Sequence, residues 1–184
     1  MFFHNINPVL FEIGPLQIRY YGLFYAIGFV IAYFLVYYLA KRRNLNITKD
    51  DVADLLLYEI IGVVFGARFI YVLFYNPTFY LQNPIEIIAV WHGGLSFHGG
   101  LLGAVIATYL FCRRKKIDFY GLADIAVVPV ALALTLGRFG NFINAELYGR
   151  ITNAAWCIDY TKNQFLQIIP EGCRHPSQIY ASVK

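Results

Sequence analysis

The chain has 184 residues, of which 59% are hydrophobic and only 14% are charged, and its net charge is +4. This balance excludes a water-soluble globular domain and is typical of a membrane protein. Aromatic residues make up 18% of the chain, more than a hydrocarbon span needs, so we expect aromatic belts at the membrane interface. The three cysteines (Cys112, Cys157 and Cys173) lack the spacing of a metal site. As partners we expect membrane lipids and no nucleic acid.

The first predicted elements are an interfacial arm and a membrane span. Residues 1–19 lack the basic start and apolar core of a secretory signal, so we predict an arm that lies on the membrane. The uncharged run over residues 20–40 is long enough to cross about 30 Å of hydrocarbon as a helix. Basic residues 41–43 follow it and mark the cytoplasmic end, which places the N-terminus in the periplasm.

The second predicted span, over residues 52–75, carries the charged residues Glu59 and Arg68 within its apolar run. They are nine residues apart, or about 13–14 Å along a helix, so they cannot pair with each other. Each therefore needs a partner on another helix or near the interface. We favour a structural ion pair or snorkelling for both residues over a catalytic role.

The stretch WHGGLSFHGG, residues 91–100, precedes the rest of the third predicted span, 95–112. Its four glycines and two histidines argue against an ordinary helix start and favour irregular backbone beside a cavity. His92 and His98 are six residues apart, a poor spacing for a shared metal on one helix. A structural role and proton transfer both remain open for His98.

The stretch GRFGNFINAELYGR, residues 137–150, ends the fourth predicted span, 121–138. Arg138 and Asn141 share one helical face there, although charged groups are costly in hydrocarbon. Two interpretations explain why Arg138 and Asn141 are present here. They form polar contacts between helices, or they form a site for an anionic ligand at the membrane surface. Basic residues 113–116 fall on the same side as the first basic cluster, which places both glycine-rich stretches at the outer face.

The last predicted part is a periplasmic segment over residues 139–180, which completes a single membrane-embedded domain of residues 1–184. Cys157 and Cys173 lie in this segment, where an oxidising compartment permits a disulfide, but the sequence supports two free thiols equally well. A predicted helix opens at Ser177, shortly before the sequence ends at Lys184. We therefore expect the native chain to continue.

Three motifs, HGGLSFHGG, GRFGNFINAELYGR and RHPSQIY, resemble the bacterial prolipoprotein diacylglyceryl transferases, in the same order from about Pro8 to Tyr180. The resemblance implies an all-α polytopic fold with seven spans in the family, about four of them in this chain. It also implies an enzyme of the bacterial inner membrane that needs no cofactor. Such an enzyme moves the diacylglyceryl group of phosphatidylglycerol to the lipobox cysteine of a preprolipoprotein, forming a thioether and releasing glycerol phosphate.

The resemblance also implies site residues. By position it gives catalytic or essential roles to Tyr21, His98 and Glu146, and phosphatidylglycerol binding to Arg138, Asn141 and Gly149. The chemistry adds Asn144, because amides offer hydrogen bonds to glycerol or phosphate oxygens. In this scheme His98 is the base for the thiol, Arg138 holds the phosphate and Glu146 orients Arg138. We expect the imidazole and the guanidinium to converge near the periplasmic rim.

The sequence departs from the family pattern in two ways, and other functions remain open. Ala181 replaces a glutamate that normally follows the last tyrosine of RHPSQIY, and the family's later helices are absent. An alternative is a transporter for an anionic solute, although the inverted repeats of such a fold are not evident. A second alternative is a non-catalytic scaffold protein, which would not explain the clustered polar residues. A third is an inactive fragment, if the native chain ends at Lys184.

Overall fold

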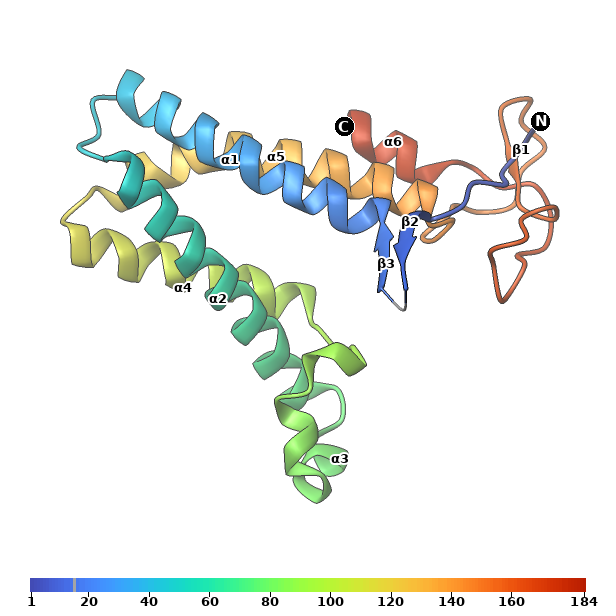
Figure 1. Cartoon of the computed structure of the whole chain (residues 1–184), viewed down its shortest axis with the longest axis horizontal. Helices are drawn as coiled ribbons and strands as arrows, with labels where there is room; N and C mark the ends of the chain where they lie inside the picture. Colours follow the sequence, from blue (N-terminus) through green and yellow to red (C-terminus); the bar gives the residue numbers. More distant parts are fainter. Residues whose placement is uncertain (15) are drawn as a thin grey trace. The chain divides into compact units, whose positions relative to one another are not determined.

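The computed structural model describes residues 1–14 and 16–184, which are mostly helical (Figure 1). The long helices of this part are α1 (Tyr20–Arg42), α2 (Lys49–Phe74), α4 (Phe97–Lys115) and α5 (Phe119–Ile143). The short helices are α3 (Pro77–Gln82), the 3-10 turns η1 (Pro84–Ile87) and η2 (Val90–His92), and α6 (Ser177–Val183). Short strands are also present: β1 (Phe2–Phe3), β2 (Val9–Ile13), β3 (Leu16–Arg19) and β4 (Ile158–Asp159).

Among the described residues, three helices are long and apolar enough to cross a membrane, namely α1, α2 and α5. The predicted class, a polytopic helical membrane protein, is confirmed. Helix α4 covers most of the third predicted span, but it carries His98, Gly99 and Gly100 in its first turn and ends in Arg113, Arg114 and Lys115, which lower its mean hydropathy. A fourth span and the periplasmic N-terminus stay predictions.

Contacts between Cα atoms divide the chain into two compact units. The single membrane-embedded domain expected from the sequence therefore stays a prediction. The terminal unit comprises Met1–Ala32 and Val127–Lys184, and the central unit comprises Tyr33–Ala126. Each unit has its own buried cluster. The cluster of the central unit is built from Val36, Ala40, Ile47, Val52, Leu55, Phe111, Cys112, Leu122 and Ile125.

The central unit is organised by close packing of α2 against α4. A Cβ atom added to Gly103 would lie 2.0 Å from the carbonyl oxygen of Gly62, and one added to Gly66 would lie 2.4 Å from that of Gly99. Backbone therefore meets backbone along this pair, as small residues allow in membrane helices. Thr48 caps α2, because its side chain accepts a hydrogen bond of 3.1 Å from the Asp51 amide.

The terminal unit joins the two ends of the described chain. Strand β1 pairs in parallel with β4, and β2 pairs with β3 as an antiparallel hairpin that leads into α1. The sequence did not predict these short sheets. Gly28 of α1 packs near Ala133 of α5, and the Thr135 hydroxyl donates a hydrogen bond of 3.2 Å to the Ser182 carbonyl of α6.

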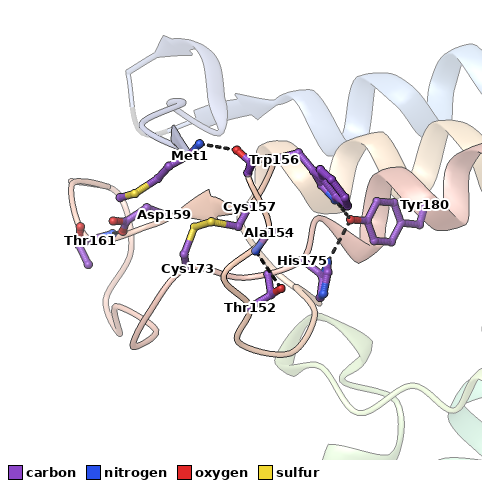
Figure 2. The surroundings of a disulfide bond; sticks show 11 residues. Met1, Thr152, Ala154, Trp156, Cys157, Asp159, Thr161, Cys173, His175 and Tyr180 are labelled. Carbon is purple, nitrogen blue, oxygen red and sulfur yellow. Dashed lines mark hydrogen bonds between the residues drawn. A yellow bond between two sulfur atoms is a disulfide. The ribbon is translucent and has the colours of Figure 1, made fainter.

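A disulfide links Cys157 to Cys173 and settles the alternative that the sequence left open (Figure 2). The two Cα atoms are 5.6 Å apart, within the usual range for a disulfide. Arg174 then pairs with Ile158 and with Ile151 in antiparallel bridges, so the cross-link lies beside a small sheet. This anchors the chain directly before the RHPSQIY motif.

Candidate active site

The loop that follows α5 presents Glu146 between two left-handed residues. Ala145 and Leu147 both have a φ of 54° although neither is a glycine. A left-handed conformation costs a non-glycine residue roughly 1–2 kcal/mol, so it persists only where neighbouring contacts hold it. The loop is therefore a strained turn that aims the Glu146 side chain.

The Glu146 carboxylate binds two amides. Nδ2 of Asn141 donates to it at 2.9 Å and Nδ2 of Asn144 donates at 3.2 Å. The Glu146 backbone amide also donates to the Asn141 carbonyl at 3.0 Å. One N–H of each amide is thus used inside the protein, while Oδ1 of Asn144 is a buried acceptor without a partner in the described part of the chain.

Tyr21 joins this group from the start of α1. Its ring packs against Gly140, where an added Cβ would lie 2.7 Å from the Tyr21 ring. Its hydroxyl lies 3.0 Å from that of Tyr25. The terminal unit thus brings together four predicted site residues, Tyr21, Asn141, Asn144 and Glu146, although their roles stay predictions.

Arg138 precedes Asn141 by three residues on α5, which places both on one helical face. Its side chain is half-buried, and over residues 1–14 and 16–184 the guanidinium makes no hydrogen bond or ion pair. The expectation that Glu146 orients Arg138 finds no support in these contacts, because the carboxylate binds the two amides. The guanidinium is left available for an anion.

Gly149 has a packing role that the sequence did not reveal. A Cβ atom at this position would lie 2.8 Å from the carbonyl oxygen of His175 and 2.9 Å from its Cβ. The Gly149 amide donates to the same carbonyl at 2.9 Å. The glycine therefore lets the segment 175–178 close over the loop that carries Glu146.

Two residues of that segment were missed as site residues. Nε2 of Gln178 donates to the Glu146 carbonyl at 2.7 Å, and the Ser177 hydroxyl donates to the Leu147 carbonyl at 2.8 Å. The sequence identified RHPSQIY as a motif, but it did not indicate that side chains of this motif bind the backbone of the loop at Glu146 and Leu147. His175 and Trp156 also both contact the Tyr180 hydroxyl, at 3.1 and 2.6 Å (Figure 2).

His98 lies in the central unit, as the second residue of α4. The sequence argument against an ordinary helix start is wrong here: Ser96 caps the helix and accepts a hydrogen bond of 3.3 Å from the Gly99 amide. Irregular backbone is confined to the preceding residues, where Gly93 and Gly94 have φ values of 85° and 75°. The His98 side chain is exposed and makes no hydrogen bond within the part of the chain that the structure describes.

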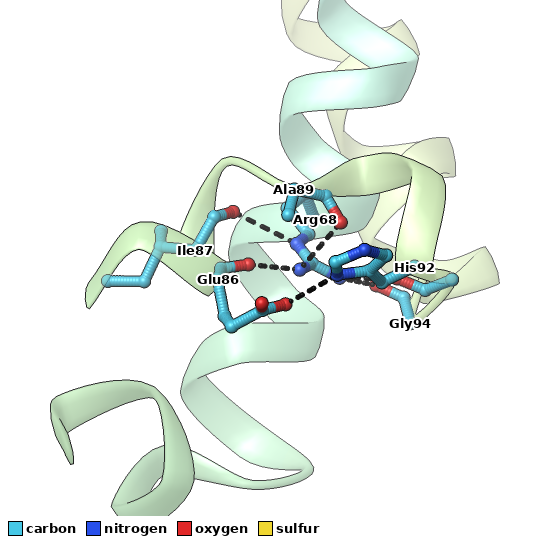
Figure 3. A network of polar contacts seen from close by, with 7 residues as sticks. Arg68, Glu86, Ile87, Ala89, His92 and Gly94 are labelled. Carbon is cyan, nitrogen blue, oxygen red and sulfur yellow. Dashed lines mark hydrogen bonds and ion pairs between the residues drawn. The ribbon is translucent and has the colours of Figure 1, made fainter. Parts of the chain in front are cut away.

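Arg68 binds backbone carbonyls among the described residues, so the predicted ion pair is wrong, while snorkelling stays a prediction (Figure 3). The side chain is only 6% exposed. The central carbon of its guanidinium lies 5.1 Å from the centre of the Tyr80 ring. The guanidinium donates to the carbonyl oxygens of Glu86, Ile87, Ala89, Gly93 and Gly94. Five acceptors spread the charge and fix the loop that leads to α4.

Glu59 has no ion pair among the described residues either, contrary to the prediction. Its carboxylate accepts a hydrogen bond of 2.6 Å from the Thr108 hydroxyl, which joins α2 to α4. The Glu86 carboxylate, in contrast, accepts from Nδ1 of His92 at 2.8 Å (Figure 3). Both contacts are structural links within the central unit.

The chain matches known proteins along almost its whole length. The family model for prolipoprotein diacylglyceryl transferase matches residues 8–184. The phosphatidylglycerol–prolipoprotein diacylglyceryl transferase of Geobacter sulfurreducens is 50% identical over 186 residues, which cover 100% of this chain and 68% of the relative. The protein of the same name from Rickettsia rickettsii is 47% identical over 180 residues, or 98% of this chain and 67% of the relative. This chain therefore belongs to the prolipoprotein diacylglyceryl transferase family.

Proposed function

We propose that the protein transfers the diacylglyceryl group of phosphatidylglycerol to a cysteine thiol of a preprolipoprotein. The observation that carries the proposal is the match over residues 8–184, with relatives of that name about half identical to this chain. A carbon–sulfur bond forms, the bond between the glycerol carbon and the phosphate oxygen breaks, and glycerol phosphate leaves with the electron pair. The reaction is a displacement and requires no redox partner.

His98 is the proposed base for the attacking thiol. A free thiol has a pKa of about 8.5 and is mostly protonated at neutral pH, so the attack on carbon needs a group that accepts its proton. The His98 ring is exposed at the start of α4, with no partner of its own among the described residues. A histidine nitrogen can accept the proton there.

Arg138 is the proposed ligand of the phosphate. Negative charge grows on the phosphate oxygens as the carbon–oxygen bond breaks. A guanidinium binds two such oxygens at once, and the attraction is strong where water is scarce. The half-buried Arg138 side chain has no carboxylate partner in the described chain, so its charge remains available for this role.

The polar group around Glu146 is the proposed site for the lipid head group. Glu146 fixes the amides of Asn141 and Asn144, and the unpartnered Oδ1 of Asn144 offers an acceptor for a glycerol hydroxyl. The Tyr21 ring packs against Gly140 close by, and Gly149 shapes the loop. These residues would position the lipid rather than take part in bond breaking.

We further propose that the site faces the periplasm from the bacterial inner membrane. The Cys157–Cys173 disulfide supports an oxidising compartment for the segment around the RHPSQIY motif. The basic ends of α1 and α4 support a cytoplasmic location for the opposite side. The acceptor cysteine of the lipobox, close to a signal helix, would then enter from the membrane.

Incubation of membranes with labelled phosphatidylglycerol and a lipobox peptide tests the function. Label should appear on the peptide thiol, and a peptide with serine in place of cysteine should remain unlabelled. Uptake of an anionic solute without transfer would support a transporter instead. The variant His98→Asn should slow thioether formation more than lipid binding, with His92→Asn as a control, whereas equal loss of both would indicate a structural role.

A further inference from the structure

We propose that Gln178 is a positioning residue for Glu146, with Ser177 as its helper. The Gln178 side chain holds the strained turn in the one conformation that directs the Glu146 carboxylate to the two asparagine amides. The inference rests on the proposed transferase function, because it assigns Gln178 an effect on the transfer rate. Nothing in the motif RHPSQIY by itself identifies the carbonyl that this side chain binds.

The contacts form a two-point clamp on the turn. Gln178 is only 1% exposed and donates to the Glu146 carbonyl at 2.7 Å, while Ser177 donates to the Leu147 carbonyl at 2.8 Å. Two consecutive side chains therefore hold two consecutive carbonyls. Since Ala145 and Leu147 are left-handed non-glycine residues, the turn would relax toward ordinary dihedral angles without these bonds.

The segment that supplies the clamp is itself fixed. The His175 amide donates to the Arg150 carbonyl at 3.0 Å, and the Gly149 amide donates to the His175 carbonyl at 2.9 Å. Arg174 exchanges two hydrogen bonds of 2.9 Å with Ile158, next to the disulfide. Gln178 therefore acts from a rigid support, so its donor cannot follow the turn if the turn relaxes.

A shift of the turn reaches the proposed head-group site directly. The Glu146 carboxylate is held by bonds of 2.9 Å to Asn141 and 3.2 Å to Asn144, and both would break if the turn rotated. Misplacement by about 1 Å can reduce an enzymatic rate about a hundredfold. Within the described residues the Gln178 side chain hydrogen-bonds the Glu146 carbonyl and neither amide, so we expect it to influence the site through Glu146.

The variant Gln178→Met keeps the size of the side chain but removes its donor. We expect it to lower the kcat of transfer in full-length protein about tenfold, because one buried hydrogen bond is lost. Gln167→Met, an exposed change in the same unit, is the matched control and should retain the wild-type rate. Ser177→Ala should act in the same direction as Gln178→Met, with Ser182→Ala as its control.

A double-mutant cycle separates positioning from general stability. In a Glu146→Gln background, Gln178→Met should lower the rate further by less than about twofold, because both changes disturb the same contact. An equal fold loss in both backgrounds overturns the inference while leaving transfer intact. Failure of both Gln178→Met and Ser177→Ala to fold also overturns it. Absence of transfer by the wild-type protein overturns the proposed function, and the positioning role falls with it.

Discussion

The Asn141 side chain donates a hydrogen bond of 2.9 Å to the Glu146 carboxylate, which joins the end of α5 to the strained loop that follows. This bond determines how the nearby charges are distributed. The carboxylate binds the two amides and forms no ion pair with Arg138 among the described residues, so the guanidinium is available for a ligand. The arrangement predicts that Arg138 acts through the shape of its guanidinium as well as through its charge.

The variant Arg138→Lys should reduce transfer about ten- to hundredfold. Lysine keeps the charge but lacks the planar fork that binds two phosphate oxygens. The rate of label transfer from phosphatidylglycerol to the acceptor peptide measures the effect. Arg43→Lys, an exposed change after α1, is the matched control. Full activity of Arg138→Lys would remove Arg138 from phosphate binding.

Gly149→Ala and Gly137→Ala should differ in their effect on stability, although each adds one methyl group. At Gly149 the methyl group would meet the His175 backbone at 2.8 Å, so we expect a loss of about 1–3 kcal/mol in unfolding free energy, and reduced transfer. At Gly137, within α5, nothing lies within 4 Å of the added atom. There alanine should be neutral or should stabilise the helix by up to about 1 kcal/mol.

Thermal unfolding in detergent compares these two glycine variants directly. Equal melting temperatures for both variants would show that the loop does not close on His175 as described. The comparison also separates a packing role of Gly149 from direct lipid binding. A variant that keeps its stability but loses only lipid binding would favour the latter.

Arg68→Lys should destabilise the loop between α3 and α4 by roughly 2–4 kcal/mol. An ammonium has three donors and cannot reach the five carbonyls that the guanidinium binds, so buried acceptors lose their partners. Hydrogen exchange should increase in residues 84–94. Arg114→Lys, whose arginine makes an exposed hydrogen bond of 2.9 Å to the Tyr58 hydroxyl, should show almost no change. Unchanged protection of the loop in Arg68→Lys would contradict the network.

His4 ties the N-terminal arm to the terminal unit as a neutral, buried imidazole. Its Nε2 donates to the Phe142 carbonyl at 2.8 Å, and its Nδ1 accepts from Nδ2 of Asn163 at 2.8 Å. The Asn163 amide cannot simply reverse, because its Oδ1 accepts a hydrogen bond of 2.8 Å from the Phe165 amide. Burial lowers the pKa of His4 from its ordinary value of 6.5.

The contribution of His4 to stability should therefore disappear at acid pH. It is fully present above the ordinary pKa of 6.5 and is lost as the pH falls below 6.5 toward the lowered value, because the unfolded chain takes up the proton first. The melting temperature in detergent should fall over this window. His4→Gln should flatten the decrease, and His92→Gln should retain it. An identical pH dependence in wild type and His4→Gln would contradict the prediction.

The membrane helices were predictable because hydrophobic length is a local property of the sequence. The boundaries of α1 and α2 follow the apolar runs closely, and basic residues end α1 as expected. Helix α5, in contrast, continues to Ile143, five residues beyond its predicted end at 138. The strained turn was not predictable, since alanine and leucine rarely adopt left-handed angles. Its conformation depends on Gln178, which is distant in sequence.

The partners of the charged residues were also beyond the sequence. The sequence favours an ion pair or snorkelling for Arg68, but a loop that folds back supplies carbonyl groups to its guanidinium. The sequence cannot show which backbone carbonyls accept these hydrogen bonds, because every residue carries a carbonyl group. The cysteine pair shows the same limit: only the geometry of the segment decided between a disulfide and two thiols.

The most direct test of the account is the mass of a lipobox peptide after incubation with the full-length protein and phosphatidylglycerol. The account predicts that the peptide gains one diacylglyceryl group on its cysteine and that glycerol phosphate is released in equal amount. His98→Asn and Arg138→Lys should each reduce both products together. An unmodified peptide, or release of glycerol phosphate without a thioether, would contradict the central claim.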